Sequence, residues 1–106
     1  MARRYERRYP PTINSPAEAG LAAAAAASLV GEEHVRRDEQ PSMGAEDFAC
    51  FLERKLRAYI WIGNGTAERG GMLHSPHYDF NDAVLPLGAS YWVRLAEAVL
   101  VRDRAV

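Results

Sequence analysis

The residue types best suited to chemistry gather in one stretch of the second half of the chain. His74 and His77 are three residues apart, and Asp79 and Asp82 follow them. Imidazole and carboxylate groups are good ligands for zinc, manganese and related ions. Pro76 disfavours a helix here, so the two histidines are not expected to share one helix face. The spacing alone leaves two interpretations open: a metal ligand, or a loop histidine hydrogen-bonded to backbone.

A second group of candidates lies near the middle of the chain. Glu46 and Asp47 are adjacent acids at the expected start of a helix, where interaction with the helix dipole explains them; a functional interpretation would place them at the edge of an active site. The single Cys50 excludes an intramolecular disulfide and a multi-cysteine zinc site. We expect it to be a small buried apolar side chain.

The composition is that of one soluble globular domain. The 106 residues are 48% hydrophobic and 25% charged, with 13 Lys+Arg, 14 Asp+Glu and a net charge of -1. This balance argues against a surface built for nucleic acid. The longest apolar run, residues 21–27, is too short to span a membrane. The first residues lack the apolar region of a signal peptide, so we expect no membrane association and a cytoplasmic location.

The sequence contains signals for the helices that would position these residues. Ser15 suits an N-cap, Pro16 the first helical position and Glu18 a capping box, and Gly31 suits a C-terminal stop. These signals predict a helix over residues 16–30.

Two further helices are expected. Phe48, Phe51 and Leu52 recur at helical spacing, which predicts a helix that begins within residues 44–47 and ends within residues 55–57. The last helix is expected to start near Asn81 or Asp82 and to run through Leu100, with Arg102 and Arg104 at its C-terminal end.

One segment, residues 58–62, has the composition of a strand that is buried on both faces. The glycines that follow it (Gly63, Gly65, Gly70 and Gly71) lack the Gly-Lys-Ser/Thr ending of a phosphate-binding loop and are interpreted as a turn. Residues 1–9 set four arginines around two tyrosines, which suits a short strand better than a basic arm for nucleic acid. One central strand cannot form a sheet, so we expect this chain to complete a sheet made by other residues, unless further strands escape the pattern.

Two stretches resemble a known family. They are Pro41-Ser42-Met43-Gly44-Ala45-Glu46-Asp47-Phe48, and residues 58–65 followed by Gly71-Met72-Leu73-His74-Ser75-Pro76 and Tyr78-Asp79-Phe80-Asn81-Asp82. In that order and spacing they resemble the C-terminal part of the hippurate hydrolase family. These are metal-dependent amidohydrolases within the larger aminoacylase and carboxypeptidase G-like peptidase family. Residues 9–14 resemble the return of that family's chain from its lid domain to its catalytic domain.

The resemblance implies an α/β fold. The chain would be the C-terminal fragment of a zinc-peptidase-like catalytic domain, with about three helices, one clear buried strand and a leading strand from the lid domain. Residues 1–13 would end the lid-domain strand and form the return linker. Residues 14–106 would be the C-terminal portion of the catalytic domain.

The resemblance also implies a function and a site. Members of the family hydrolyse the amide bond of N-acyl amino acids with two metal ions, usually zinc or manganese. The histidine of the Leu-His-Ser-Pro motif, here His74, would be the last metal ligand. Met43, Gly44 and Glu46 would lie at the active-site wall and contact substrate, with packing as the alternative role.

The family's other motifs have no counterpart in this sequence. They are a Cys-Gly-His-Asp type motif, paired glutamates and a middle histidine, so no catalytic residue is assigned. One ligand cannot activate a water molecule, and we expect the isolated chain to be inactive and to bind no metal tightly. The expected partner is the missing N-terminal catalytic portion or another chain, and homo-oligomers are left open. The alternative is a non-catalytic remnant or interaction module that folds against a partner chain.

Overall fold

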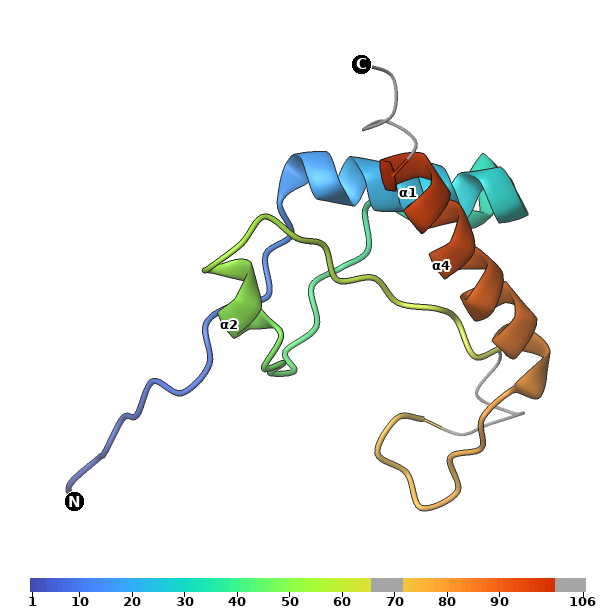
Figure 1. Cartoon of the computed structure of the whole chain (residues 1–106). Coiled ribbons are helices and arrows are strands. Elements are labelled where there is room, and N and C mark those ends of the chain that lie inside the picture. The colour runs from blue at the N-terminus through green and yellow to red at the C-terminus, as the bar shows by residue number, and fades with distance from the viewer. Residues whose placement is uncertain (66–71, 101–106) are drawn as a thin grey trace.

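The computed structural model describes residues 1–65 and 72–100, and in these ranges the regular structure is helical. In chain order the elements are α1 (Pro16–Val30), the 3-10 turn η1 (Glu32–His34), α2 (Ala49–Leu52), the 3-10 turn η2 (Asp82–Val84) and α4 (Leu85–Leu100). Figure 1 shows α4 crossing α1, with long irregular segments between them. Four residues with predicted roles, Gly70, Gly71, Arg102 and Arg104, lie outside the described ranges.

Helix α1 has the predicted bounds, but its start is made differently. Pro16 occupies the first turn, and Gly31, with φ of 86°, donates its backbone N–H to the Ala27 carbonyl at 2.9 Å. The side chain of Ser15 makes no cap hydrogen bond to the helix. Its hydroxyl oxygen accepts the backbone N–H of Arg57 at 3.1 Å instead. The predicted capping box is therefore wrong, and Ser15 joins the helix start to a distant segment.

Helix α2 is much shorter than the sequence predicts. It covers four residues, and its last turn is followed by exposed charged side chains. Phe48 packs against Phe51 and Tyr59, with ring centroids 5.9 and 5.4 Å apart. Cys50 is exposed, so the expectation of a buried thiol is wrong. The apolar stripe that predicted a longer helix ends at Leu52, and nothing after it continues a buried face.

The predicted α/β fold is wrong for the described residues, which contain no strand. A β-strand forms backbone hydrogen bonds with a neighbouring strand. In segment 58–62 the side chain of Asn14 replaces that neighbouring strand for one residue. Tyr59 donates its N–H to Asn14 Oδ1 at 2.8 Å, and Asn14 Nδ2 donates to the Tyr59 carbonyl at 2.9 Å. Residues 1–9 are likewise exposed and form no strand.

The core between the elements is small. Ala22 and Ala25 of α1, Ala49 of α2 and Tyr91 of α4 are the buried apolar residues of the described ranges. Because alanine has a short side chain, α1 and α4 can approach each other closely. The Cα radius of gyration is 17.0 Å, whereas a compact domain of this length has about 13 Å. The described residues are therefore extended around the contact between α1 and α4.

Helix α4 has two apolar faces. Its less exposed face carries Leu87, Tyr91 and Leu95, and its exposed face carries Leu85, Trp92, Val93, Val99 and Leu100. By length and composition alone, residues 82–100 could also cross a membrane, contrary to the expectation that no segment could. Core helices of soluble proteins share that composition, and Arg94 and Glu97 form an ion pair at 3.6 Å on this helix.

Candidate functional site

The candidate metal ligand His74 lies in a pair of consecutive turns. Ser75 donates its N–H to the Met72 carbonyl at 3.0 Å, and Tyr78 donates its N–H to the Ser75 carbonyl at 3.1 Å. The Ser75 hydroxyl accepts the His77 N–H at 3.1 Å. The half-buried Ser75 thus anchors both turns, while His74 stays exposed.

The backbone of His74 is in the left-handed region, with φ of 64°. It is the one residue other than glycine with positive φ in the described ranges. Such a conformation is uncommon outside glycine, and it is retained where surrounding structure over-determines it, often at functional sites. The turn therefore holds the imidazole outward at a small energetic cost.

The described residues supply one candidate ligand and not a complete metal site. His77, Asp79 and Asp82 are near His74 in sequence, yet no three potential ligands converge anywhere in the described ranges. Zinc sites in proteins normally use three or four protein ligands. The donor chemistry of His74 suits zinc or manganese, but a metal ion held there would need ligands from elsewhere.

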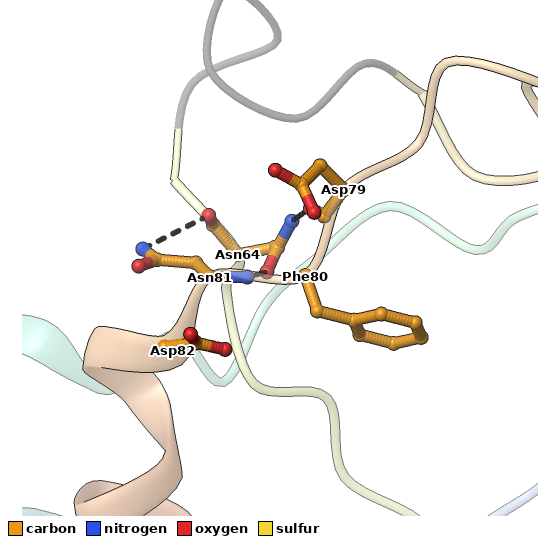
Figure 2. A pocket seen from close by; sticks show the side chains of 5 residues that line it. All are labelled: Asn64, Asp79, Phe80, Asn81 and Asp82. Carbon is orange, nitrogen blue, oxygen red and sulfur yellow. Dashed lines mark hydrogen bonds between the residues drawn. The ribbon is translucent and has the colours of Figure 1, made fainter.

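The two ends of the His74 loop are joined by asparagine side chains. Asn64 Nδ2 donates to the Asp79 carbonyl at 2.9 Å, and Asn64 Oδ1 accepts the Asn81 N–H at 2.9 Å. Asn81 Nδ2 donates to the Asn64 carbonyl at 3.3 Å. Figure 2 shows these bonds beside a pocket of about 190 Å³, which Phe80 and Asp82 also line. We call this pair of residues the Asn64–Asn81 clasp.

Glu46 is held in place by the segment that was expected to be a strand. Its carboxylate accepts the Tyr59 hydroxyl at 3.1 Å and the Phe48 N–H at 3.3 Å. The pKa of Glu46 is lowered, first by hydrogen bonding with the Asp47 side chain and then by the bonds from Phe48 and Tyr59. The pKa of Tyr59 is raised, first by burial and then by Glu46. Glu46 is therefore an ionised hydrogen-bond partner of Tyr59.

Met43 and Gly44, the other two predicted wall residues, are exposed. Figure 1 shows residues 43–46 beside α2 and the His74 loop at the far end of segment 58–65. In the described ranges no hydrogen bond or ion pair joins these two groups. The structure thus brings Glu46 to Tyr59 but does not bring the predicted wall residues to His74.

The sequence interpretation missed the asparagines. The sequence places Asn64 in a glycine turn, Asn81 at a helix start and Asn14 at the end of the segment that resembles the return from the lid domain, and it predicts none of their side-chain contacts. A signal was present, because asparagine beside glycine or before a helix commonly bonds backbone groups. What the spacing cannot show is which distant backbone each side chain reaches.

The chain is similar to known proteins over most of its length. Residues 2–98 match the model of Peptidase family M20/M25/M40. The chain is 37% identical over 87 residues to the hippurate hydrolase of Campylobacter jejuni, covering 82% of this chain and 22% of that protein. It is 36% identical over 94 residues to IAA-amino acid hydrolase ILR1-like 6 of Arabidopsis thaliana, covering 87% of this chain and 20% of that protein.

A third relative is the N-acetylcysteine deacetylase of Bacillus subtilis, 31% identical over 93 residues, which cover 87% of this chain and 23% of that protein. No solved structure matches the chain significantly. The chain belongs to peptidase family M20/M25/M40. It spans about a fifth of the length of the curated relatives it matches.

Proposed function

We propose that this chain is the C-terminal segment of a metal-dependent amidohydrolase that cleaves the amide bond of N-acyl amino acids, and that His74 is its metal ligand. The observation that carries the proposal is the exposed His74 in a left-handed turn, inside the motif through which the chain resembles its family. Hippurate hydrolase, IAA-amino acid hydrolase and N-acetylcysteine deacetylase are names of hydrolases that act on such bonds.

The division of labour follows from the ligand count. A zinc or manganese ion would supply Lewis-acid chemistry and lower the pKa of a bound water molecule. This chain would contribute the His74 imidazole, held outward by the turns anchored at Ser75. The other ligands and the general base would come from the missing N-terminal catalytic portion. The isolated chain is therefore expected to have no activity and no tightly bound metal.

The test is complementation. The chain is co-expressed with hippurate hydrolase of Campylobacter jejuni from which the fifth that matches this chain has been removed, and the purified complex is assayed for bound Mn²⁺ or Zn²⁺ and for hippurate cleavage. We expect activity from the complex and none from either part alone. His74→Ala should lower both the metal affinity and the activity by about 100-fold or more, because even residues that only orient a metal ligand contribute 10- to 100-fold.

The matched control is His77→Ala, which removes the same kind of side chain three residues further along the loop. This variant should keep metal content and activity near those of the unaltered complex. Equal activity of His74→Ala and the unaltered chain would contradict the ligand role. Metal-dependent turnover by the pure isolated chain would contradict the division of labour.

A further inference from the structure

The Asn64–Asn81 clasp joins two parts of the chain that are far apart in sequence. Asn64 follows a segment whose Ile62 side chain lies beside Gly88 of α4. A Cβ atom added to Gly88 would be 3.6 Å from Ile62 Cδ1. Asn81 precedes η2 and α4, and its Oδ1 accepts the Ala83 N–H at 3.1 Å as an N-cap. Asn81 therefore bonds the start of the last helix with one side-chain atom and the Asn64 carbonyl with the other.

The clasp closes the loop that carries His74. The three bonds between Asn64 and residues 79–81 span 15 to 17 positions of sequence. Gly65 follows Asn64 with φ of 103°, a conformation that lets the chain leave the clasp sharply. A loop whose ends are fixed has fewer conformations than one with free ends. The described part of the loop is thus held at its base, and His74 is presented from it.

We propose that Asn64 and Asn81 are positioning residues for His74: their mutual hydrogen bonds set the base of the loop and thereby the place of the imidazole relative to α4. The inference depends on the proposed function, since His74 needs a fixed position only if it binds a metal. Asn64 reproduces one step of a strand ladder, because its amide offers a donor and an acceptor to the backbone at Asp79 and Asn81. Alanine at position 64 offers neither.

The experiment measures the clasp and His74 separately in the full chain, without metal. Amide hydrogen exchange follows the Asn81 N–H, and the ring signals of His74 are followed by NMR at one fixed pH, with His34 as an internal reference. Asn64→Ala should speed exchange of the Asn81 amide by about tenfold or more, since two hydrogen bonds are lost. The His74 ring signals should shift and broaden, while those of His34 stay unchanged.

The matched control is Asn14→Ala. Asn14 makes the same two-bond contact with the backbone of Tyr59, so its loss destabilises the chain in a similar way at a different place. It should speed exchange at Tyr59 and leave the His74 signals unchanged. Asn81→Ser keeps a side-chain oxygen for the helix cap but loses the amide that reaches Asn64, and it should shift the His74 signals as Asn64→Ala does.

Three results would overturn the inference. They are unprotected exchange of the Asn81 amide in the unaltered chain, His74 signals that do not respond to Asn64→Ala, and an equal response to Asn14→Ala. None of these readouts involves metal or hydrolysis. Loss of the ligand role of His74 in the complementation test, with the clasp intact here, would instead count against the proposed function alone.

Discussion

At the scale of single residues, the structure separates two kinds of polar side chain. His74 is exposed to solvent, and its backbone conformation costs energy. Glu46 is tied to Tyr59 and Phe48. A residue whose hydrogen bonds are taken up internally stabilises structure, whereas an exposed one in a strained turn is free to bind something else. His74 therefore remains the functional candidate, whereas the Glu46 carboxylate is already engaged by Tyr59 and Phe48.

The Glu46–Tyr59 contact has a defined pH range. Because the pKa of Glu46 is lowered, its contribution is complete above its unfolded pKa and is lost as pH falls through the lowered value. Because the pKa of Tyr59 is raised, the neutral phenol contributes fully below its ordinary value of about 10 and is lost as pH rises through the raised one. Between these limits Tyr59 donates to an ionised carboxylate.

Glu46→Gln tests this assignment. The variant keeps an oxygen acceptor but removes the charge, so the pKa of Tyr59 should fall. It should stay above its ordinary value, because burial is the first cause of its rise. NMR titration of the tyrosine rings measures the change. The pKa of Tyr91 is raised by burial alone and should not move. An unchanged pKa at Tyr59 would contradict the contact.

At the scale of elements, the contact between α1 and α4 is the main packing of the chain. Tyr91 is 4% exposed, whereas its neighbour Trp92 is 64% exposed. Tyr91→Ala should therefore destabilise the chain by about 3 kcal/mol, a cost typical of removing a buried aromatic side chain. Trp92→Ala, the matched control, should cost less than about 1 kcal/mol. Urea titration followed by far-ultraviolet circular dichroism measures both.

Two outcomes of that experiment are informative. If the unaltered chain is less stable than the expected loss, Tyr91→Ala will abolish the cooperative transition while Trp92→Ala keeps it. If the two variants are equally destabilised, Trp92 is covered in solution, and its assignment to an exposed face of α4 is wrong.

How well the sequence predicts an element depends on where its stabilising partners lie. Helix α1 was predicted with the correct bounds because Pro16 and Gly31 act locally, and alanine favours helix wherever it is. Segment 58–62 was predicted as a strand from its composition, yet a strand needs backbone partners that composition does not reveal. Here the backbone of Tyr59 forms hydrogen bonds with the side chain of Asn14 instead. The candidate His74 was found by its motif, whereas the clasp that holds its loop depends on pairing between distant residues.

At the scale of the whole molecule, the chain exposes more surface than a compact protein of its mass. The accessible surface is 9699 Å², whereas a compact protein of 11.8 kDa exposes about 5,900 Å². The excess, roughly 3,800 Å², is larger than the half-share of even an obligate dimer, which is about 1,000 to 2,500 Å². A second copy of the chain would therefore not cover it. We propose the remaining four-fifths of an M20-type chain as the partner that covers it.

The exposed face of α4 is the place to test this partner. The double variant Trp92→Glu, Val93→Lys places charges in the middle of that face and should weaken binding to the truncated Campylobacter hippurate hydrolase by about thirtyfold or more, the loss expected for a central aromatic contact. Arg94→Glu, next along the same helix, is the control and should bind nearly as the unaltered chain does.

Three measurements decide between possible occupants of this face, because each occupant leaves a different signature. Isothermal titration against the truncated hydrolase should show binding that the double variant loses. Sedimentation of the chain alone should show no stable dimer, since a second copy would leave part of the excess area in water. Flotation with phosphatidylcholine–phosphatidylglycerol vesicles should show no stable association, because a helix that docks on protein keeps Arg94 and Glu97 at the wet edge of the contact. Tight vesicle binding, or a dimer that the double variant dissolves without any affinity for the hydrolase portion, would refute the proposed partner and assign the face to a membrane or to a second copy.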